Sequence, residues 1–328
     1  MKIVIDMMGG DNGVKATIPA LLDFVKLHED IYVYAVGDNS LDSSLKGFKN
    51  IEIIHSKTIL RMDVDPMTSY RDENSSLMVA VKAYLDNKCD ALVSAGSSGA
   101  LLTASIFKIK RIENVIRPGF ITSFPTVKKG KYFVVCDLGA NNSNTKEELH
   151  QFAKMGSLFY EFVYQEKNPR VNLLSNGTED EKGSPVTKEA FKLIKADKTI
   201  NFKGNTEGRD ALFGDIDVLV CDGFSGNIFL KATEGTAKAM SFMIKEAFSR
   251  NIFSKIGYLL SKKGIKDMRT RMDYKNVGGA MLVGVNGIVI KAHGNSDEQS
   301  FLSALNLSYK LAKDKIVDKF KAEIKWKA

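Results

Sequence analysis

The sequence is poor in the residues that build disulfides and histidine-based metal sites. It has 3 cysteines and 4 histidines among 328 residues. Cys89, Cys136 and Cys221 form no C-x-x-C pair and lie in or beside apolar, strand-like runs, which is typical of buried free thiols in a reducing cytoplasm. The histidines are far apart in sequence, which argues against a zinc site. A chain of this length buries about three quarters of its unfolded surface without such cross-links.

Long apolar runs and the common nucleotide and metal motifs are also missing. No run reaches the roughly 18 apolar residues of a membrane span, and residues 1–6 are too short and too acidic a start for a signal peptide. The chain has no G-x-x-x-x-G-K-[ST], G-x-G-x-x-G, H-E-x-x-H or EF-hand pattern. These absences argue against a P-loop NTPase, a standard dinucleotide site and a zinc protease.

The excess of positive over negative charge lies in the second half of the chain. The net charge is +8, yet residues 1–150 carry 18 basic and 18 acidic side chains, whereas residues 151–328 carry 29 and 21. Residues 245–275 alone carry nine basic and three acidic side chains. Such a region attracts acidic proteins or anionic lipid, or is a solvated lysine-rich surface. We expect no nucleic-acid partner, because no zinc finger, RRM or KH signature accompanies the lysines.

Short β-branched runs alternate with longer helical patterns along the chain. Several of the runs are apolar throughout, which predicts strands covered on both faces of a mostly parallel sheet. We expect strands at 2–6, 31–37, 51–55, 91–94, 119–123, 132–137, 171–174, 217–221 and 281–290, the last with a turn at 286–287. We expect helices at 15–27, 74–86, 100–108, 146–164, 188–195, 226–250 and 297–320.

Four glycine-rich turns, at 4–13, 92–100, 134–142 and 219–227, each follow a predicted strand and precede a helix. Parallel strands end at one edge of a sheet, so the turns should converge there. Glycine lets backbone approach a ligand closely, and the N–H groups at a helix start favour an anion. Each turn alone is also consistent with an ordinary strand-to-helix connection. The candidate phosphate or substrate ligands are Asp6, Gly9, Gly10, Asp11, Ser94, Ser97, Ser98, Gly99, Asn141 and Gly223.

Four further residues are candidates for catalysis: Asp222, Asn227, Lys291 and His293. Lys291 and His293 end the last predicted strand, where they are suited to neutralising charge or protonating a leaving group. An alternative is a serine hydrolase or thioesterase with a Ser97-Asp222-His293 triad, because residues 95–99 resemble a nucleophile elbow. Lys182, in an acidic stretch, is either solvated or a substrate contact.

The segment 245–275 contains an amphipathic pattern that we expect to protrude as a helix. Large apolar side chains fall within an arc of about 120° on a helix, with lysines around them. This arrangement fits an interfacial helix on anionic lipid. Packing on the core or on a dimer mate is the other interpretation. The apolar residues are Ile252, Phe253, Ile256, Leu259 and Leu260.

The chain resembles the bacterial phosphate acyltransferase family from Lys2 to about Ser300. Residues 6–11 (DMMGGD) are similar to the opening signature of that family, and six more motifs fit in order, at 36–38, 74–76, 137–141, 204–209, 222–227 and 291–294. The chain departs from the pattern in Ser97-Ser98, where the family has Asn-Thr, in Ser175, where it has Asn, and in the mostly acidic stretch 71–73.

The resemblance implies transfer of a long acyl chain from acyl carrier protein to inorganic phosphate, without cofactor or metal. The acyl phosphate would then serve a downstream glycerol-3-phosphate acyltransferase in phospholipid synthesis. The implied fold is a three-layer α/β/α sandwich with a mostly parallel sheet, similar to phosphotransacetylases and isopropylmalate dehydrogenases, in a single domain over 1–328. The family also implies a cytoplasmic homodimer held peripherally at the inner face of the cell membrane.

Overall fold

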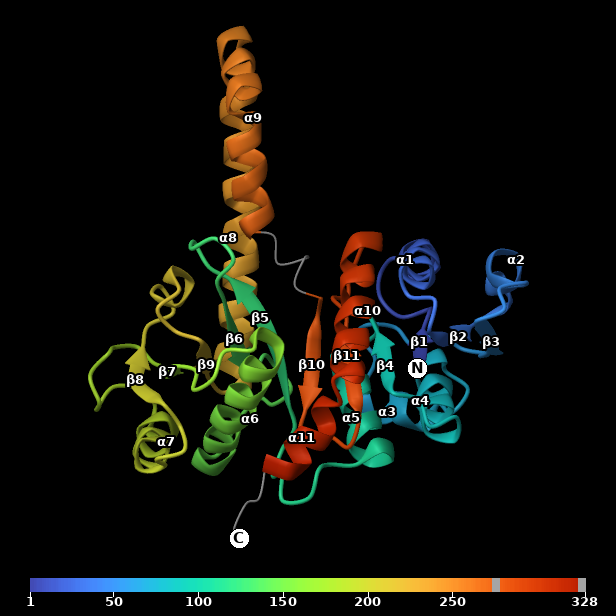
Figure 1. Cartoon of the computed structure of the whole chain (residues 1–328), viewed down its shortest axis with the longest axis horizontal. Coiled ribbons are helices and arrows are strands. Elements are labelled where there is room, and N and C mark those ends of the chain that lie inside the picture. Colours follow the sequence, from blue (N-terminus) through green and yellow to red (C-terminus); the bar gives the residue numbers. More distant parts are fainter. Residues whose placement is uncertain (273–277, 324–328) are drawn as a thin grey trace. The chain divides into compact units, whose positions relative to one another are not determined.

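The computed structural model describes residues 1–272 and 278–323, and its contacts divide the chain into two compact units (Figure 1). Unit 1 contains residues 1–122, 161–166 and 277–328, and unit 2 contains residues 123–160 and 167–276. Both units are built from strands and helices that alternate along the chain. The single domain over 1–328 stays a prediction.

The sheet of unit 1 is mostly parallel. Its strands follow the order β3-β2-β1-β4-β11-β10-β5. The first five strands in this order run parallel to their neighbours, and β10 is antiparallel to both β11 and β5. The strands are β1 (Lys2–Asp6), β2 (Tyr32–Gly37), β3 (Ile51–His55), β4 (Ala91–Ser94), β10 (Ala280–Val283), β11 (Ile288–Lys291) and β5 (Gly119–Pro125), which continues into unit 2.

Helices cover both faces of this sheet. The helix α10 (Glu298–Lys313) packs on β4, β11 and α1 (Val14–Leu27), whereas α4 (Ser76–Asp86) packs on β1, β2 and β4. Figure 1 shows α1 and α10 on one side of these strands and α4 on the other. The predicted α/β/α sandwich is therefore confirmed. The shorter helices are η1 (Asn39–Leu41), α2 (Asp42–Leu45), α3 (Pro66–Arg71), α5 (Ser98–Ala104), the π-helical η2 (Ser105–Ile109) and α11 (Ile316–Glu323).

Unit 2 has parallel strands in the order β6-β9-β7-β8. Its helix α6 approaches β9 closely at Gly156, which has no side chain. A Cβ at this position would lie only 2.6 Å from a Val218 methyl. The elements are β6 (Tyr132–Cys136), β7 (Val171–Leu174), β8 (Phe202–Thr206), β9 (Val218–Val220), α6 (Lys146–Tyr164), α7 (Pro185–Ala196), η3 (Ala211–Phe213), α8 (Gly223–Ser249) and α9 (Ile252–Met272).

Four of the longer helices begin at a Ser or Asp that caps them. In each, the capping side chain accepts a hydrogen bond from the N–H three residues further along, which satisfies one of the unpaired donors of the first turn. The capping residues are Ser75 for α4, Ser184 for α7, Asp222 for α8 and Asp297 for α10.

The helices α8 and α9 form an antiparallel hairpin that extends beyond the sheet of unit 2 (Figure 1). Of the segment 245–275 that we expected to protrude as one helix, residues 245–249 end α8 and residues 252–272 form α9, while residues 273–275 lie outside the described residues. Within 1–272 and 278–323, no helix is both long and apolar enough to cross a bilayer.

Three expectations about single elements were wrong. The predicted helix 297–320 is broken into α10 and α11, because Lys315 adopts a positive φ of 53° between them. The predicted helix 100–108 starts at Ser98 and widens into the π-helical η2. The strand β8 was not predicted, because its sequence FKGNT carries no apolar run.

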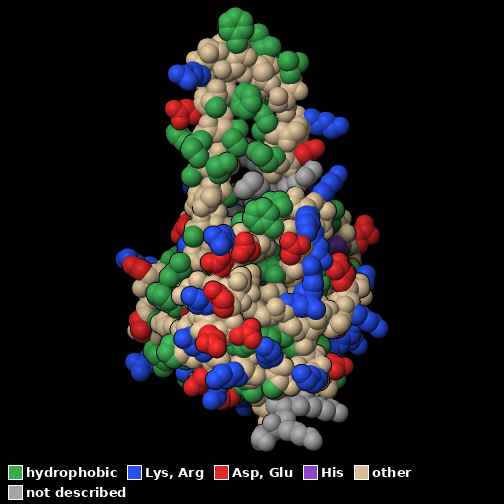
Figure 2. All heavy atoms as spheres, turned by 90° about the vertical axis from the view of Figure 1, so that its left-hand side faces the viewer, with side chains coloured by type: hydrophobic (Ala, Val, Ile, Leu, Met, Phe, Trp, Pro, Cys, Tyr) green, Lys and Arg blue, Asp and Glu red, His purple; other side chains and the backbone are tan. Residues whose placement is uncertain are grey.

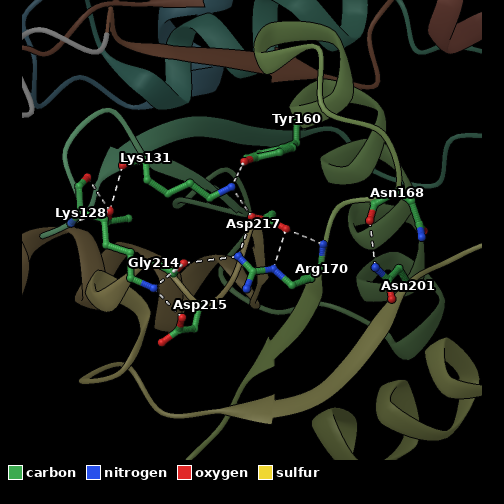
Figure 3. A network of polar contacts seen from close by, with 10 residues as sticks. Lys128, Lys131, Tyr160, Asn168, Arg170, Asn201, Gly214, Asp215 and Asp217 are labelled. Atoms are coloured by element: carbon green, nitrogen blue, oxygen red, sulfur yellow. Dashed lines mark hydrogen bonds and ion pairs between the residues drawn. The ribbon is translucent and has the colours of Figure 1, made fainter.

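A buried carboxylate at the amino ends of β7 and β9 joins loops of unit 2 (Figure 3). Asp217, whose side chain is 7% exposed, accepts hydrogen bonds from the Arg170 guanidinium at 2.9 and 3.0 Å and pairs with Lys131 at 3.0 Å. Lys131 also donates to the Tyr160 hydroxyl at 2.9 Å. Burial alone would raise the pKa of Asp217, but the bonds from Arg170 and Lys131 outweigh it and hold the pKa below its usual range.

We predict that Asp217→Asn lowers the free energy of unfolding by about 2–3 kcal/mol at pH 7, because charged hydrogen bonds are lost. A carboxylate with a lowered pKa stabilises the fold above the pKa of the unfolded chain, about 3.9. The difference from wild type should therefore shrink as the pH falls below about 4. Urea unfolding at pH 7 and pH 3 measures it. Asp215→Asn, at an exposed partner of Lys128, is the control and should change nothing measurable; an equal effect of both variants would contradict the account.

Candidate active site

Three neighbouring strands of unit 1 end at one level, and their last residues are buried and polar. Asp6 of β1 is in register with Ser94 of β4, and Ser94 is in register with Lys291 of β11. All three side chains are buried. The sequence-predicted loops that follow these strands therefore start side by side at the carboxyl edge of the sheet.

The three loops touch through backbone atoms. A Cβ on Gly9 would lie 2.6 Å from the Gly96 nitrogen and 2.8 Å from an Asp6 carboxylate oxygen. Gly10 has a φ of 88°, and a Cβ there would lie 2.8 Å from the Gly294 carbonyl oxygen. The Asp11 N–H donates to that same Gly294 oxygen at 2.7 Å. Only glycine fits at positions 9 and 10, because any side chain would push the loops apart.

The buried carboxylate of Asp6 links the loop after β1 to the loop after β4. Its carboxylate accepts a hydrogen bond from the Ser94 hydroxyl at 2.7 Å, and the same Ser94 oxygen accepts one from the Gly96 N–H at 3.0 Å. The Met8 N–H donates to the other carboxylate oxygen at 3.3 Å. Burial raises the pKa of Asp6, and the hydrogen bonds from Ser94 and Ser76 oppose this rise. With its oxygens occupied in this way, Asp6 orients loops rather than accepting a substrate proton.

Two of the three N–H groups at residues 9–11 already have partners within the protein, and ligand binding by these residues stays a prediction. The Gly9 N–H is bound to Asp6 and the Asp11 N–H to Gly294. Gly10 is the remaining donor of those three. This loop therefore shapes the site more than it binds an anion.

The start of α5 in unit 1 has no side-chain cap. Ser97 is the N-cap and is buried, yet its side chain makes no capping hydrogen bond. The first-turn N–H groups, from Ser98 onward, have no acceptor within the helix. The helix continues through η2 to Ile109, and its N-terminal end carries the partial positive charge that favours an anion.

Lys291 lies beside this helix start, and His293 follows it by two residues on the loop after β11. The Lys291 ammonium donates to the carbonyl oxygens of Ala95 (at 3.2 Å) and Ala292, which fixes a positive charge under the loop that leads into α5. His293 is half-buried, and its Nδ1 faces the Asn295 N–H at 3.4 Å. A ring whose Nδ1 accepts carries its proton on Nε2, so it is set to donate rather than to deprotonate a serine.

Unit 2 has a second loop cluster, between β6 and the start of α8. Asp137 accepts hydrogen bonds from the Ala140 N–H and from the Asn141 backbone and side chain, at 2.8 to 3.0 Å. A Cβ on Gly223 or Gly226 would overlap backbone oxygens of this loop. The start of α8 is thus packed directly onto the loop after β6.

This second cluster holds a predicted catalytic residue, Asp222, and two predicted substrate ligands, Asn141 and Gly223, and their polar groups are hydrogen-bonded within the protein. The Gly223 N–H donates to the Asn144 side chain at 3.1 Å, and Asp222 accepts from the Ser225 N–H at 2.9 Å as the cap of α8. Asn141 is buried with its amide turned to Asp137. Asp222, Asn141 and Gly223 therefore build the loop, while Asn227 is exposed next to Gly139.

The geometry at both clusters disfavours the serine hydrolase interpretation. A triad needs His293 Nδ1 to donate to a carboxylate, whereas Nδ1 here accepts from Asn295 and Asp222 is used as a helix cap. Lys182 is exposed on the loop after β7, with its side-chain stem next to Gly177. Among the described residues, no group of three or more His, Cys, Asp or Glu is placed to hold a metal ion.

Sequence reasoning missed two supporting residues, Ser76 and Asn144. Ser76 reaches Asp6 from α4, on a part of the chain that carried no catalytic expectation. Asn144 is held by Glu148, which also forms a capping box with Thr145 at the start of α6. The pattern T-x-x-E is a recognised helix-start signal, so the sequence contained a pointer to this second position.

The sequence and the fold are both similar to those of known proteins. The model of a family described as fatty acid synthesis protein matches residues 1–319. A phosphate acyltransferase of Streptococcus pneumoniae is 41% identical over 307 residues, 93% of each chain. One of Streptococcus suis is 40% identical over 321 residues, 97% of this chain and 96% of that protein.

Solved structures with lower identity share the fold. A phosphotransacetylase from Streptococcus pyogenes matches with a TM-score of 0.62 at 17% identity, over 96% of this chain and 94% of that one. A phosphotransacetylase from Staphylococcus aureus matches with a TM-score of 0.58 at 18% identity, over 95% and 94% of the two chains. The predicted similarity to the phosphotransacetylase fold is confirmed.

We predict that Gly9→Ala weakens the binding of inorganic phosphate about tenfold or more. The added methyl group would push the Gly96 loop, and with it the start of α5, away from its position, and a charged hydrogen bond is worth about 1.5–3 kcal/mol. Calorimetric titration with phosphate measures the loss. Gly235→Ala in α8, where a Cβ meets nothing within 4 Å, is the matched control. Unchanged phosphate binding in folded Gly9→Ala would refute this role of the glycine contact.

Proposed function

The chain belongs to the phosphate acyltransferase family, described also as the fatty acid synthesis protein family, and from that premise we propose its acyl donor, its mechanism and its partners. The protein is an acyltransferase that transfers an acyl group to phosphate in lipid synthesis. Its donor, in our proposal, is a long-chain acyl thioester of acyl carrier protein. The acyl phosphate product is then consumed in the acylation of glycerol 3-phosphate.

The observation that supports phosphate as the substrate of unit 1 is the open start of α5 beside a buried lysine. The N–H groups of Ser98 and Gly99 lack acceptors within the helix, and Lys291 supplies a positive charge under the same loop. Donors of this kind, fixed before the substrate arrives, bind an anion without reorganisation. Gly10 adds one more backbone donor from the neighbouring loop.

Phosphate is already an anion at neutral pH, so the enzyme has no need to deprotonate its nucleophile. A phosphate oxygen attacks the thioester carbonyl carbon, the C–S bond breaks and a thiolate leaves. Lys291 offsets the negative charge that develops, and the Nε2–H of His293 donates a hydrogen bond to the departing thiolate, which takes its proton from water after it leaves. Asp6 and Ser94 hold the loops in place, so positioning supplies much of the rate acceleration.

The partners follow from charge and exposed apolar surface. Acyl carrier protein is acidic, and the excess of basic residues in 151–328 complements it. The hairpin exposes Phe253 to 80% and Leu260 to 85%, and Figure 2 shows hydrophobic side chains grouped along this projection with Lys and Arg beside them. A lipid surface on the inner face of the membrane is the occupant we propose, with a homodimer mate as the alternative.

We predict that thiol release from palmitoyl-carrier protein requires inorganic phosphate, and that His293→Ala lowers kcat more than tenfold. Without the Nε2–H, the negative charge that builds on the leaving sulfur loses a hydrogen bond. Thiol release is followed with and without phosphate, and His55→Ala, at an exposed histidine of β3, is the control. Release without phosphate would instead support a hydrolase, and an unchanged kcat would remove His293 from the mechanism.

We predict that Phe253→Ser combined with Leu260→Ser abolishes cosedimentation with vesicles that contain anionic lipid. The two side chains are exposed on α9 and are suited to entering the lipid interface. Phe213→Ser, at an exposed phenylalanine of η3 in the same unit, is the control. Vesicle binding that persists, together with a dimer that dissociates in sedimentation velocity, would assign the hairpin to the subunit interface.

A further inference from the structure

One loop of unit 1 closes on itself and reaches the candidate active site. It connects β3 to α4, and its ends pair as a β-bridge between Thr58 and Ser75. The Thr58 N–H donates to the Asn74 oxygen at 3.3 Å, and the Ser76 N–H donates to the Thr58 oxygen at 3.0 Å. Residues 59–74 thus form a compact surface loop with joined ends, a form that is frequently functional. We call residues 59–67 of it the strap.

The strap touches two of the loops that form the phosphate site. Pro66 lies against α5, where a Cβ on Gly99 would be 2.7 Å from its Cγ. Met62 lies against the loop after β11, where a Cβ on Gly294 would be 2.8 Å from its Cε. Gly294 directly follows His293 in the chain. The strap therefore contacts α5 at Gly99 and the loop after β11 at Gly294, the residue that follows His293.

The strap presents apolar side chains to solvent. Ile59 is 52% exposed, Met62 38% and Met67 42%. Its charged pair, Arg61 with Asp63, is highly exposed and makes bonds of 2.8 and 3.0 Å within the strap. Exposed apolar side chains gathered next to a polar site point to an apolar ligand. Methionine is suited to this role because its flexible thioether adapts to the shape of the ligand.

We propose that the strap binds the acyl chain of the substrate, with the first methylenes after the reacting carbonyl on Met62 and the following ones on Ile59 and Met67. The inference rests on the proposed function. The reaction joins an anionic phosphate to an apolar chain, so the product needs N–H donors and apolar surface next to each other. Unit 1 supplies both, because Met62 contacts the loop after β11 at Gly294, and Ile59 and Met67 are exposed on the same strap.

The direct test compares decylphosphonate with ethylphosphonate, two stable anions that differ in chain length alone. Wild type should bind decylphosphonate at least tenfold more tightly, since buried methylenes add affinity, with a negative heat-capacity change. In Met62→Ser combined with Ile59→Ser, the ratio of the two affinities should fall at least tenfold. Met62→Leu, which keeps the apolar surface, should retain the ratio. Titration calorimetry on the full chain gives all values.

The control is Leu27→Ser, at an exposed leucine at the end of α1, which should leave the ratio as in wild type. Equal affinity of wild type for both phosphonates, or an unchanged ratio in the double variant, would overturn the strap as the acyl site. These outcomes are separate from failure of the proposed function, which would appear as thiol release that needs no phosphate. If the double variant bound both phosphonates more weakly by the same factor, the strap would only support the loops, and the proposal would also be overturned.

Discussion

The site in unit 1 depends on backbone-to-backbone contact between three loops. Gly9 approaches the Gly96 nitrogen and Gly10 approaches the Gly294 oxygen so closely that no side chain fits at positions 9 and 10, and these contacts bring the loops after β1, β4 and β11 together. The buried carboxylate of Asp6 then ties two of the loops to the sheet through Ser94 and the Met8 N–H. Because parallel strands end at one edge, the three loops start next to one another, and the glycines let their backbones come into contact. The fixed positions of α5 and Lys291 follow from these contacts.

Two similar-looking loop clusters have different chemistry. Both contain a strand end, an aspartate, glycines and the start of a helix. In unit 2 the start of α8 is satisfied internally, because Asn144 and Asp222 accept its N–H groups. In unit 1 the start of α5 has no side-chain cap. A helix start binds an anion only where its donors remain unoccupied, and for this reason our proposal assigns phosphate recognition to α5.

The sequence predicted the fold better than it predicted the donors. The strands at 2–6, 51–55, 91–94 and 171–174 matched residue for residue, because each is dense in apolar or β-branched residues between turn signals. The polar strand β8 and the break at Lys315 were missed, since tertiary context decides both. Whether an N–H group is already hydrogen-bonded depends on contacts between residues that are distant in sequence, such as the bond from the Gly223 N–H to the Asn144 side chain. The strap was missed because 59–67 shows neither helical nor strand periodicity.

The central claim is that phosphate itself attacks the acyl carbonyl at the start of α5. The most direct measurement uses inorganic phosphate labelled with ¹⁸O in all positions and palmitoyl-carrier protein, with mass spectrometry of the product. The account predicts palmitoyl phosphate that retains all the phosphate label, including the oxygen bonded to the acyl carbon. Unlabelled palmitic acid as the first product, or an acylated enzyme trapped in the absence of phosphate, would contradict it.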